Sequence, residues 1–123
     1  MDADVAALAQ RYMAGLRSSA PIADEATARL YDALHFDAGR GIGDEAVWEI
    51  AMYAVRAATD DGERWNIGDG LIDVTVSSRP TLLERWVAAY DTDPAVRAVF
   101  EVMWDEVHSR GHRSVWCGRA RAD

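Results

Sequence analysis

The sequence predicts an all-α fold, a single-domain bundle of five to six short amphipathic helices. Apolar residues recur at three- and four-residue spacings along most of the chain, which is the periodicity of a helix with one buried face. Short turns containing glycine, proline and aspartate separate these segments. Half of the 123 residues are apolar and only 3 are proline, which is typical of a globular domain and not of a disordered chain.

The N-terminal part of the chain predicts two helices. Asp2 can cap the first helix, whose apolar face is formed by Val5, Leu8, Ala9, Tyr12, Met13 and Leu16. The break Ser18-Ser19-Ala20-Pro21 ends it. A second helix is expected near residues 22–36, with a stripe formed by Ala26, Leu30, Ala33 and Leu34.

The third expected helix has the widest apolar face and is therefore predicted to be central. Asp44 is its expected N-cap, and Asp60-Asp61-Gly62 is its expected end, with Gly62 in the left-handed position after the last turn. The apolar face is formed by Val47, Ala51, Ala54, Val55 and Ala58, widened by Trp48 and Met52.

The stretch WNIGDG, residues 65–70, is expected to be a loop that leads into a short helix beginning at Gly70. Asp69 would cap that helix, and Asp73 in its first turn would complement the helix dipole. Residues 74–76 favour a strand by propensity. We expect a helix there, because no second run alternates well enough to pair with a strand.

Two further helices and a tail complete the prediction. Thr81 and Glu84 have the spacing of a capping box at the start of a helix that ends near Asp91. Asp93 and Pro94 are the expected N-cap and first residue of the last helix, whose face holds Val96, Val99, Phe100, Met103, Trp104 and Val107. The domain is expected to span residues 1–108, followed by an arginine-rich tail, 109–123, that Val115 and Trp116 can dock onto it.

The charge is acidic and unevenly placed. The 13 basic residues are all arginine, which we attribute to the codon usage of a GC-rich bacterial genome, and 21 acidic residues bring the formal net charge to −8. Residues 1–108 hold 9 arginines against 20 acids, whereas the tail holds 4 arginines against Asp123. Such a body disfavours nucleic acid, which is bound by clustered cations. It favours a basic protein partner.

The chain start and the cysteine content predict a cytoplasmic protein. The N-terminus begins with acidic residues in place of the basic region of a signal peptide, and no apolar run is long enough to span a bilayer. The single cysteine, Cys117, permits no internal disulfide, which agrees with a reducing compartment.

Residues 65–73 are the candidate site, and two ligand classes are disfavoured there. Asp69 would repel a phosphate, and the lysine of a phosphate-binding loop is missing. Taking Gly70 as the glycine of a calcium loop places Asp69, Ile67 and Trp65 at ligand positions, and two of these cannot ligate. Two interpretations stay open: Asp69 merely caps a helix, or the segment forms a binding site. The candidate binding residues are Trp65, Asn66, Asp69, Asp73 and, from the tail, Trp116.

Metal binding, cofactor binding and catalysis are not expected. His108, His112, Cys117 and Asp105 could together ligate zinc, but Gly111 interrupts a shared helical face and the surrounding arginines oppose a cation. Cys117 has no positioned base nearby in the sequence. We therefore assign no catalytic residue, no metal and no cofactor.

The five tryptophans fall into two groups. Trp48, Trp86 and Trp104 lie on apolar helical faces and are expected in the core. Trp65 and Trp116 are not explained by periodicity. They are therefore candidates for exposed anchors, because tryptophan is over-represented at interface hot spots.

The segment from Asp44 to Trp104 resembles a small bacterial helical family of unknown function with the pattern W…G-x-G-P-L-E-D-L-L…D-P…W. The matching residues are Trp48, then Gly68-Asp69-Gly70-Leu71-Ile72-Asp73-Val74-Thr75-Val76, then Asp93-Pro94 and Trp104. Leu71 replaces the family's proline, Asp73 its glutamate and Val74 its second acid. The resemblance implies a helical fold and a recurrent loop-to-helix junction at residues 68–70, and it implies no activity.

These observations predict a non-enzymatic, acidic protein-binding domain, in its sharpest form an inhibitor or immunity-type protein for a basic effector. A small enzyme or ligand-binding protein that uses the Trp65–Asp73 segment is one alternative. A homo-oligomer in which the third and last helices meet their copies is the other.

Overall fold

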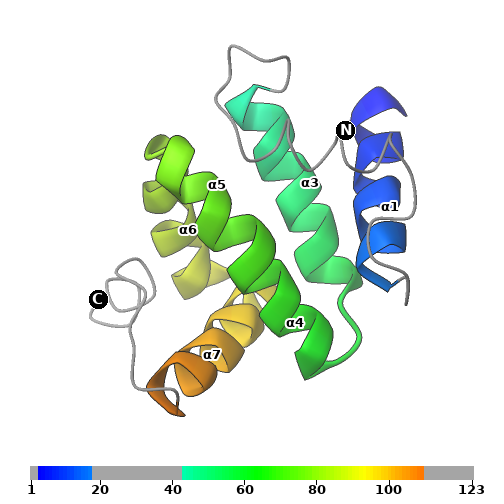
Figure 1. Ribbon diagram of the computed structural model, residues 1–123. Coiled ribbons are helices and arrows are strands. Elements are labelled where there is room, and N and C mark those ends of the chain that lie inside the picture. Colours follow the sequence, from blue (N-terminus) through cyan, green and yellow to red (C-terminus); the bar gives the residue numbers. More distant parts are fainter. Residues whose placement is uncertain (1–2, 18–42, 110–123) are drawn as a thin grey trace.

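The computed structural model describes residues 3–17 and 43–109, and within these ranges the chain is helical with no strand (Figure 1). The predicted all-α single-domain bundle is confirmed. The elements are α1 (Ala3–Arg17), α3 (Asp44–Ala57), α4 (Asp61–Ile67), the π-helix η2 (Gly68–Ile72), α5 (Asp73–Ser78), α6 (Thr81–Thr92) and α7 (Pro94–Ser109). The helix expected near residues 22–36 and most of the expected tail, residues 110–123, lie outside the described residues.

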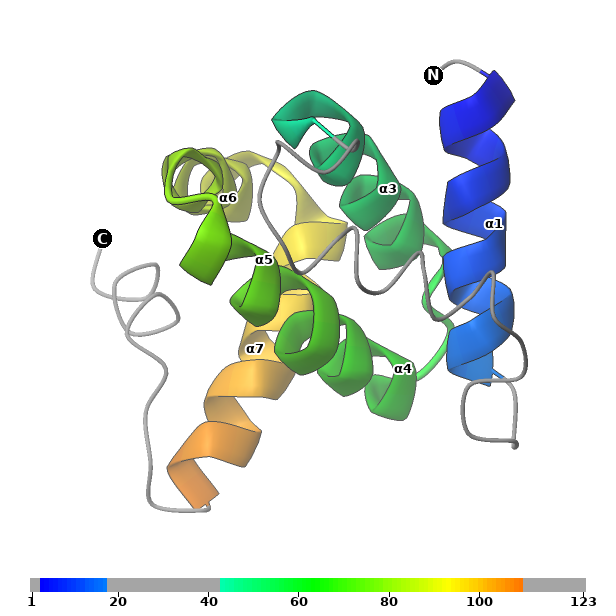
Figure 2. The same cartoon turned by 45° about the horizontal axis from the view of Figure 1, so that its top comes forward.

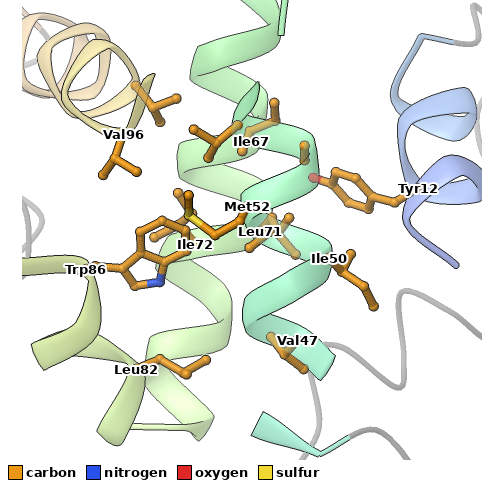
Figure 3. Close-up of a cluster of buried hydrophobic side chains, with 14 of the residues drawn as sticks. Tyr12, Val47, Ile50, Met52, Ile67, Leu71, Ile72, Leu82, Trp86 and Val96 are labelled. Carbon is orange, nitrogen blue, oxygen red and sulfur yellow. The ribbon is translucent and has the colours of Figure 1, made fainter. Parts of the chain in front are cut away.

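Helix α3 is central, as its wide apolar face predicts. It lies between α1 on one side and α4, α5 and α6 on the other in both views (Figures 1 and 2). Its buried residues are Val47, Ile50, Ala51, Met52, Ala54 and Val55. Figure 3 shows Tyr12 pointing from α1 toward α3, while Leu71, Ile72 and Trp86 meet Met52 from the other side. One hydrophobic cluster therefore joins the helices.

Helix α1 forms as its periodicity predicts and buries Ala9, Tyr12 and Met13. Its last residue, Arg17, fixes its end to the turn between α3 and α4. The Arg17 guanidinium donates to the Ala57 carbonyl at 2.7 Å and to the Glu63 carboxylate at 2.9 Å. One arginine thus satisfies a carbonyl at the C-terminus of α3, where cations are favoured.

The prediction that Gly62 ends α3 in a left-handed turn is wrong. Helix α3 ends at Ala57, and Gly62 lies in the first turn of α4. The physical reason is a cap at Asp60, whose carboxylate accepts the Glu63 N–H at 2.8 Å. Glu63 returns a bond by accepting the Thr59 N–H at 2.9 Å. This reciprocal cap begins a new helix where the glycine suggested an end.

The expected loop at residues 65–70 is instead helical. Helix α4, η2 and α5 follow one another without a break from Asp61 to Ser78, so Asp69 caps no helix and no helix begins at Gly70. At the end of η2 the Asp73 N–H bonds to the Gly68 carbonyl, an i to i−5 bond. The expectation of helix over residues 74–76 is correct.

Close packing against α7 explains why position 68 is a glycine. It is buried in a helical conformation, with φ −63° and ψ −51°, against α7. A Cβ at this position would collide with Sδ and Cγ of Met103. Gly68 therefore lets two helices approach closely and opens no loop.

Two predicted helix caps near the junction between α5 and α6 are wrong. Thr81 does not form a capping box with Glu84, because Pro80 holds the N-cap position of α6 and no side chain caps it; the Thr81 hydroxyl donates to Asp44 at 3.0 Å. Asp44 is not the N-cap of α3, since Gly43 holds that position with no side-chain bond. The predicted cap of α7 is confirmed, because Asp93 accepts the Ala95 N–H at 3.0 Å.

Candidate binding groove

The structure does not gather the predicted site residues around a cavity. Trp65, Asn66, Asp69 and Asp73 lie along one continuous helix, where Asn66 and Asp69 are exposed and Trp65 and Asp73 are half-buried. Trp65 is half-buried and packs against the hydrophobic cluster, and its role as a binding anchor stays a prediction. Trp116 lies outside the described residues.

An open groove lies elsewhere, between α3 and the C-terminal half of α6, with a volume of about 730 Å³. Its walls combine acidic, aromatic and small side chains. The lining residues are Glu45, Trp48, Glu49, Met52, Tyr53, Arg56, Ala57, Ala89, Thr92 and Asp93. Of the predicted binding residues that the structure describes, Trp65, Asn66, Asp69 and Asp73, none lines this groove.

At one end of the groove, an arginine of the chain itself contacts two of the lining residues, Trp48 and Glu45. The Arg85 guanidinium from α6 lies 4.3 Å from the centroid of the Trp48 ring, and its Nη1 is 2.7 Å from Oε2 of Glu45. A cation over an aromatic face and beside a carboxylate is favourable for both contacts. The hydrogen bond from Arg85 lowers the pKa of Glu45 below its ordinary value.

At this end of the groove Trp48 packs on the hydrophobic core. Trp48 packs against Trp86 with ring centroids 4.4 Å apart. Trp86 is 1% exposed and meets Phe100 of α7 edge-on at 6.2 Å. Of the three tryptophans predicted in the core, Trp86 is confirmed there, whereas Trp48 and Trp104 are half-buried and pack against the cluster.

A second ion pair bounds the opposite end of the groove. Arg56 Nη2 of α3 lies 3.2 Å from Oδ2 of Asp93, at the junction of α6 and α7. The other carboxylate oxygen of Asp93 caps α7 through Ala95. Asp93 therefore both caps α7 and pairs with Arg56, which ties the end of α3 to the start of α7.

Between these two ion pairs the groove is lined by Glu49 and Tyr53 of α3, and α6 contributes Ala89 and Thr92. Glu49 forms no ion pair within residues 3–17 and 43–104. The arrangement offers a carboxylate, an aromatic ring and free volume, a combination that can accommodate a cationic side chain.

Other ion pairs lie outside the groove and connect helices. Arg79, whose side chain is 1% exposed, donates to Asp44 at 2.8 Å, and this bond lowers the pKa of Asp44. The hydrogen bond from Arg17, with help from the Thr59 N–H, lowers the pKa of Glu63 to about 2. The first pair holds α3 to the junction between α5 and α6, and the second holds α1 to α4.

The described part of the chain contains neither a candidate metal site nor a candidate membrane-spanning helix. No group of three or more histidine, cysteine, aspartate or glutamate side chains there could hold a metal ion. His108, His112 and Cys117 are not tested, because their side chains lie outside it. No described helix is both long and apolar enough to cross a bilayer.

Comparisons of the chain with protein-family models, with curated proteins and with solved structures found no match. The family resemblance inferred from the sequence stays a prediction.

Proposed function

We propose that this chain is a protein-binding domain whose groove between α3 and α6 takes a basic segment of a partner protein. The observation that carries the proposal is the groove itself, which is lined by the carboxylate of Glu49, the ring of Tyr53 and the half-buried ring of Trp48. In its sharpest form the domain is an inhibitor or immunity-type protein that covers a basic effector.

The charge of the chain supports a basic partner. The formal net charge is −8, and Arg17, Arg56, Arg64, Arg79 and Arg85 each pair with a carboxylate of the same chain. Most described arginines are therefore engaged internally, and the excess acids define the field that an approaching partner meets. Such a field accelerates encounter with a positive surface. The same field repels the phosphates of a nucleic acid. The proposed binding function requires no cofactor.

The two alternative functions receive less support from the geometry. The alternative ligand site at Trp65–Asp73 depends on these residues forming a loop. The segment is instead a helix packed on the core. A homo-oligomer through the third and last helices would need their apolar residues, and Val47, Ile50, Val99 and Phe100 are buried within one chain. We retain the cytoplasmic location as part of the proposal.

Isothermal titration against the basic proteins encoded beside this one in its genome tests the proposal. We expect binding that weakens by about tenfold when salt is raised from about 0.05 to about 0.3 M, because screening reduces the attraction between exposed charges. Glu49→Gln should weaken binding, whereas Asp91→Asn, which removes the same charge from an exposed residue outside the groove, should not. Absence of binding, or equal loss in both variants, would contradict the proposal.

A further inference from the structure

The groove repeats, one helical turn later, the surroundings that Arg85 occupies. Glu49 follows Glu45 by four residues on α3, so both carboxylates lie on the same face. The residue one turn after Trp48 is Met52, and the aromatic ring at this level comes from the next residue, Tyr53; all three line the groove. The second set therefore repeats the carboxylate and offers an aromatic ring one residue further along α3.

On α6 the arginine is not repeated. On α6 the residue four positions after Arg85 is Ala89, which lines the groove at the level of the second set. Two ion pairs show that the helices keep this order along the groove, because Glu45 meets Arg85 at one end and Arg56 meets Asp93 at the other. The side chain that would fill the open part of the groove is therefore replaced by a methyl group.

We propose that the open part of the groove, bounded by Glu49, Tyr53 and Ala89, is a subsite for an arginine side chain of the partner protein. This inference rests on the proposed function and names the residue type that the groove recognises. Arg85 is the internal template, since its guanidinium already combines an aromatic face with a carboxylate.

Arginine is favoured over lysine for a physical reason. A planar guanidinium can stack on an aromatic ring while its fork of donors meets a carboxylate, and both Nη atoms of Arg85 approach Glu45, at 2.7 and 3.5 Å. An ammonium group makes a point contact and keeps its hydration. Arg56 also faces the subsite from α3, but its charge is balanced by Asp93 at 3.2 Å.

The fold offers a substitution that closes the subsite from within. Ala89→Arg places a guanidinium where the template predicts one, so it should occupy Glu49 and Tyr53 and exclude a partner's arginine. Ala88→Arg is the matched control, because it adds the same charge at the neighbouring, exposed position of α6 that does not line the groove. Arg85→Ala should do the reverse and open a second subsite at Trp48 and Glu45.

Titration of the full chain with nona-arginine and nona-lysine, at about 0.15 M salt, tests the inference. We expect nona-arginine to bind at least about threefold more tightly, and Ala89→Arg to weaken its binding about tenfold, against about twofold for Ala88→Arg. Arg85→Ala should strengthen binding. Circular dichroism establishes that each variant is folded. If Ala89→Arg fails to fold, Glu49→Gln against Asp91→Asn replaces that pair.

The outcomes separate the inference from the proposed function. Equal affinity for the two peptides, with a selective loss in Ala89→Arg, would overturn the arginine preference and leave the groove as a site for basic segments. Equal loss in Ala89→Arg and Ala88→Arg would overturn both, because binding would then follow overall charge and not the groove.

Discussion

The helix that contains Trp65–Asp73 and the groove between α3 and α6 differ in how their distinctive residues are used. In the helix, Ile67, Leu71 and Ile72 are fully buried, and Gly68 is in close contact with Met103. In the groove, Glu49 and Tyr53 border open volume. The unusual sequence at residues 65–73 thus serves packing. The ordinary helical pattern of α3 borders a groove, because the facing residue of α6, Ala89, is small.

The largest difference in stability between the two regions is expected when their tryptophans, Trp86 and Trp65, are replaced by alanine. Trp86→Ala should lower the free energy of unfolding by about 3–5 kcal/mol, because a fully buried indole is replaced by a cavity beneath the groove. Trp65→Ala should cost about half as much, since the side chain is only half-buried. Urea unfolding measures both values, and an equal or larger loss for Trp65→Ala would contradict the assignment of the groove floor to the core.

The two glycines of the helix should respond in opposite directions. Gly68→Ala should destabilise the protein by about 1–3 kcal/mol, because the new methyl group collides with the buried Met103 side chain. Gly70→Ala should be neutral or stabilising by up to about 1 kcal/mol, because no atom lies within 4 Å of the added Cβ and alanine favours the helix. Thermal unfolding of the two variants provides the measurement. Equal losses would contradict the packing role of Gly68.

The ion pair between Arg17 and Glu63 predicts a pH dependence of stability that does not involve the groove. The folded pKa of Glu63, about 2, lies below its ordinary value of 4.5, so the stabilisation is fully present above about pH 4.5 and is lost as the pH falls toward 2. Glu63→Gln should therefore lower stability near neutral pH and flatten its dependence between these pH values. Urea unfolding at a series of pH values tests this, and an unchanged slope in the variant would contradict it.

The smallest effect is expected at the acid that the sequence placed in a candidate site. Asp69 is exposed and caps no helix, so Asp69→Asn should change the free energy of unfolding by less than about 0.5 kcal/mol. It should also leave the affinity for nona-arginine unchanged within about twofold. A selective loss of affinity in Asp69→Asn, measured by titration, would return the binding site to this helix.

The helices were predictable where the apolar face alone decides the structure. The buried faces of α1, α3 and α7, and the cap at Asp93, follow from residue spacing and from the chemistry of the helix end. The predictions failed at Gly62 and Gly68. Glycine suggests a break in an isolated segment, but the cap at Asp60 and the contact with Met103 decided the outcome.

The groove could not be predicted because it depends on which residue of α6 faces Glu49. The repeats of Glu45 and Glu49, and of Arg85 and Ala89, are visible in the sequence as four-residue spacings. Their alignment is set by packing between helices about forty residues apart in the chain, for which spacing within one helix carries no information.

The most direct test of the central claim is a map of backbone amide chemical shifts of the full chain during titration with nona-arginine. The account predicts that the perturbed amides cluster in residues 45–57 of α3 and residues 85–93 of α6 and its C-terminal end, with little change at residues 65–73. A cluster at residues 65–73, or changes spread over all acidic surfaces, would show that the groove is not the binding site.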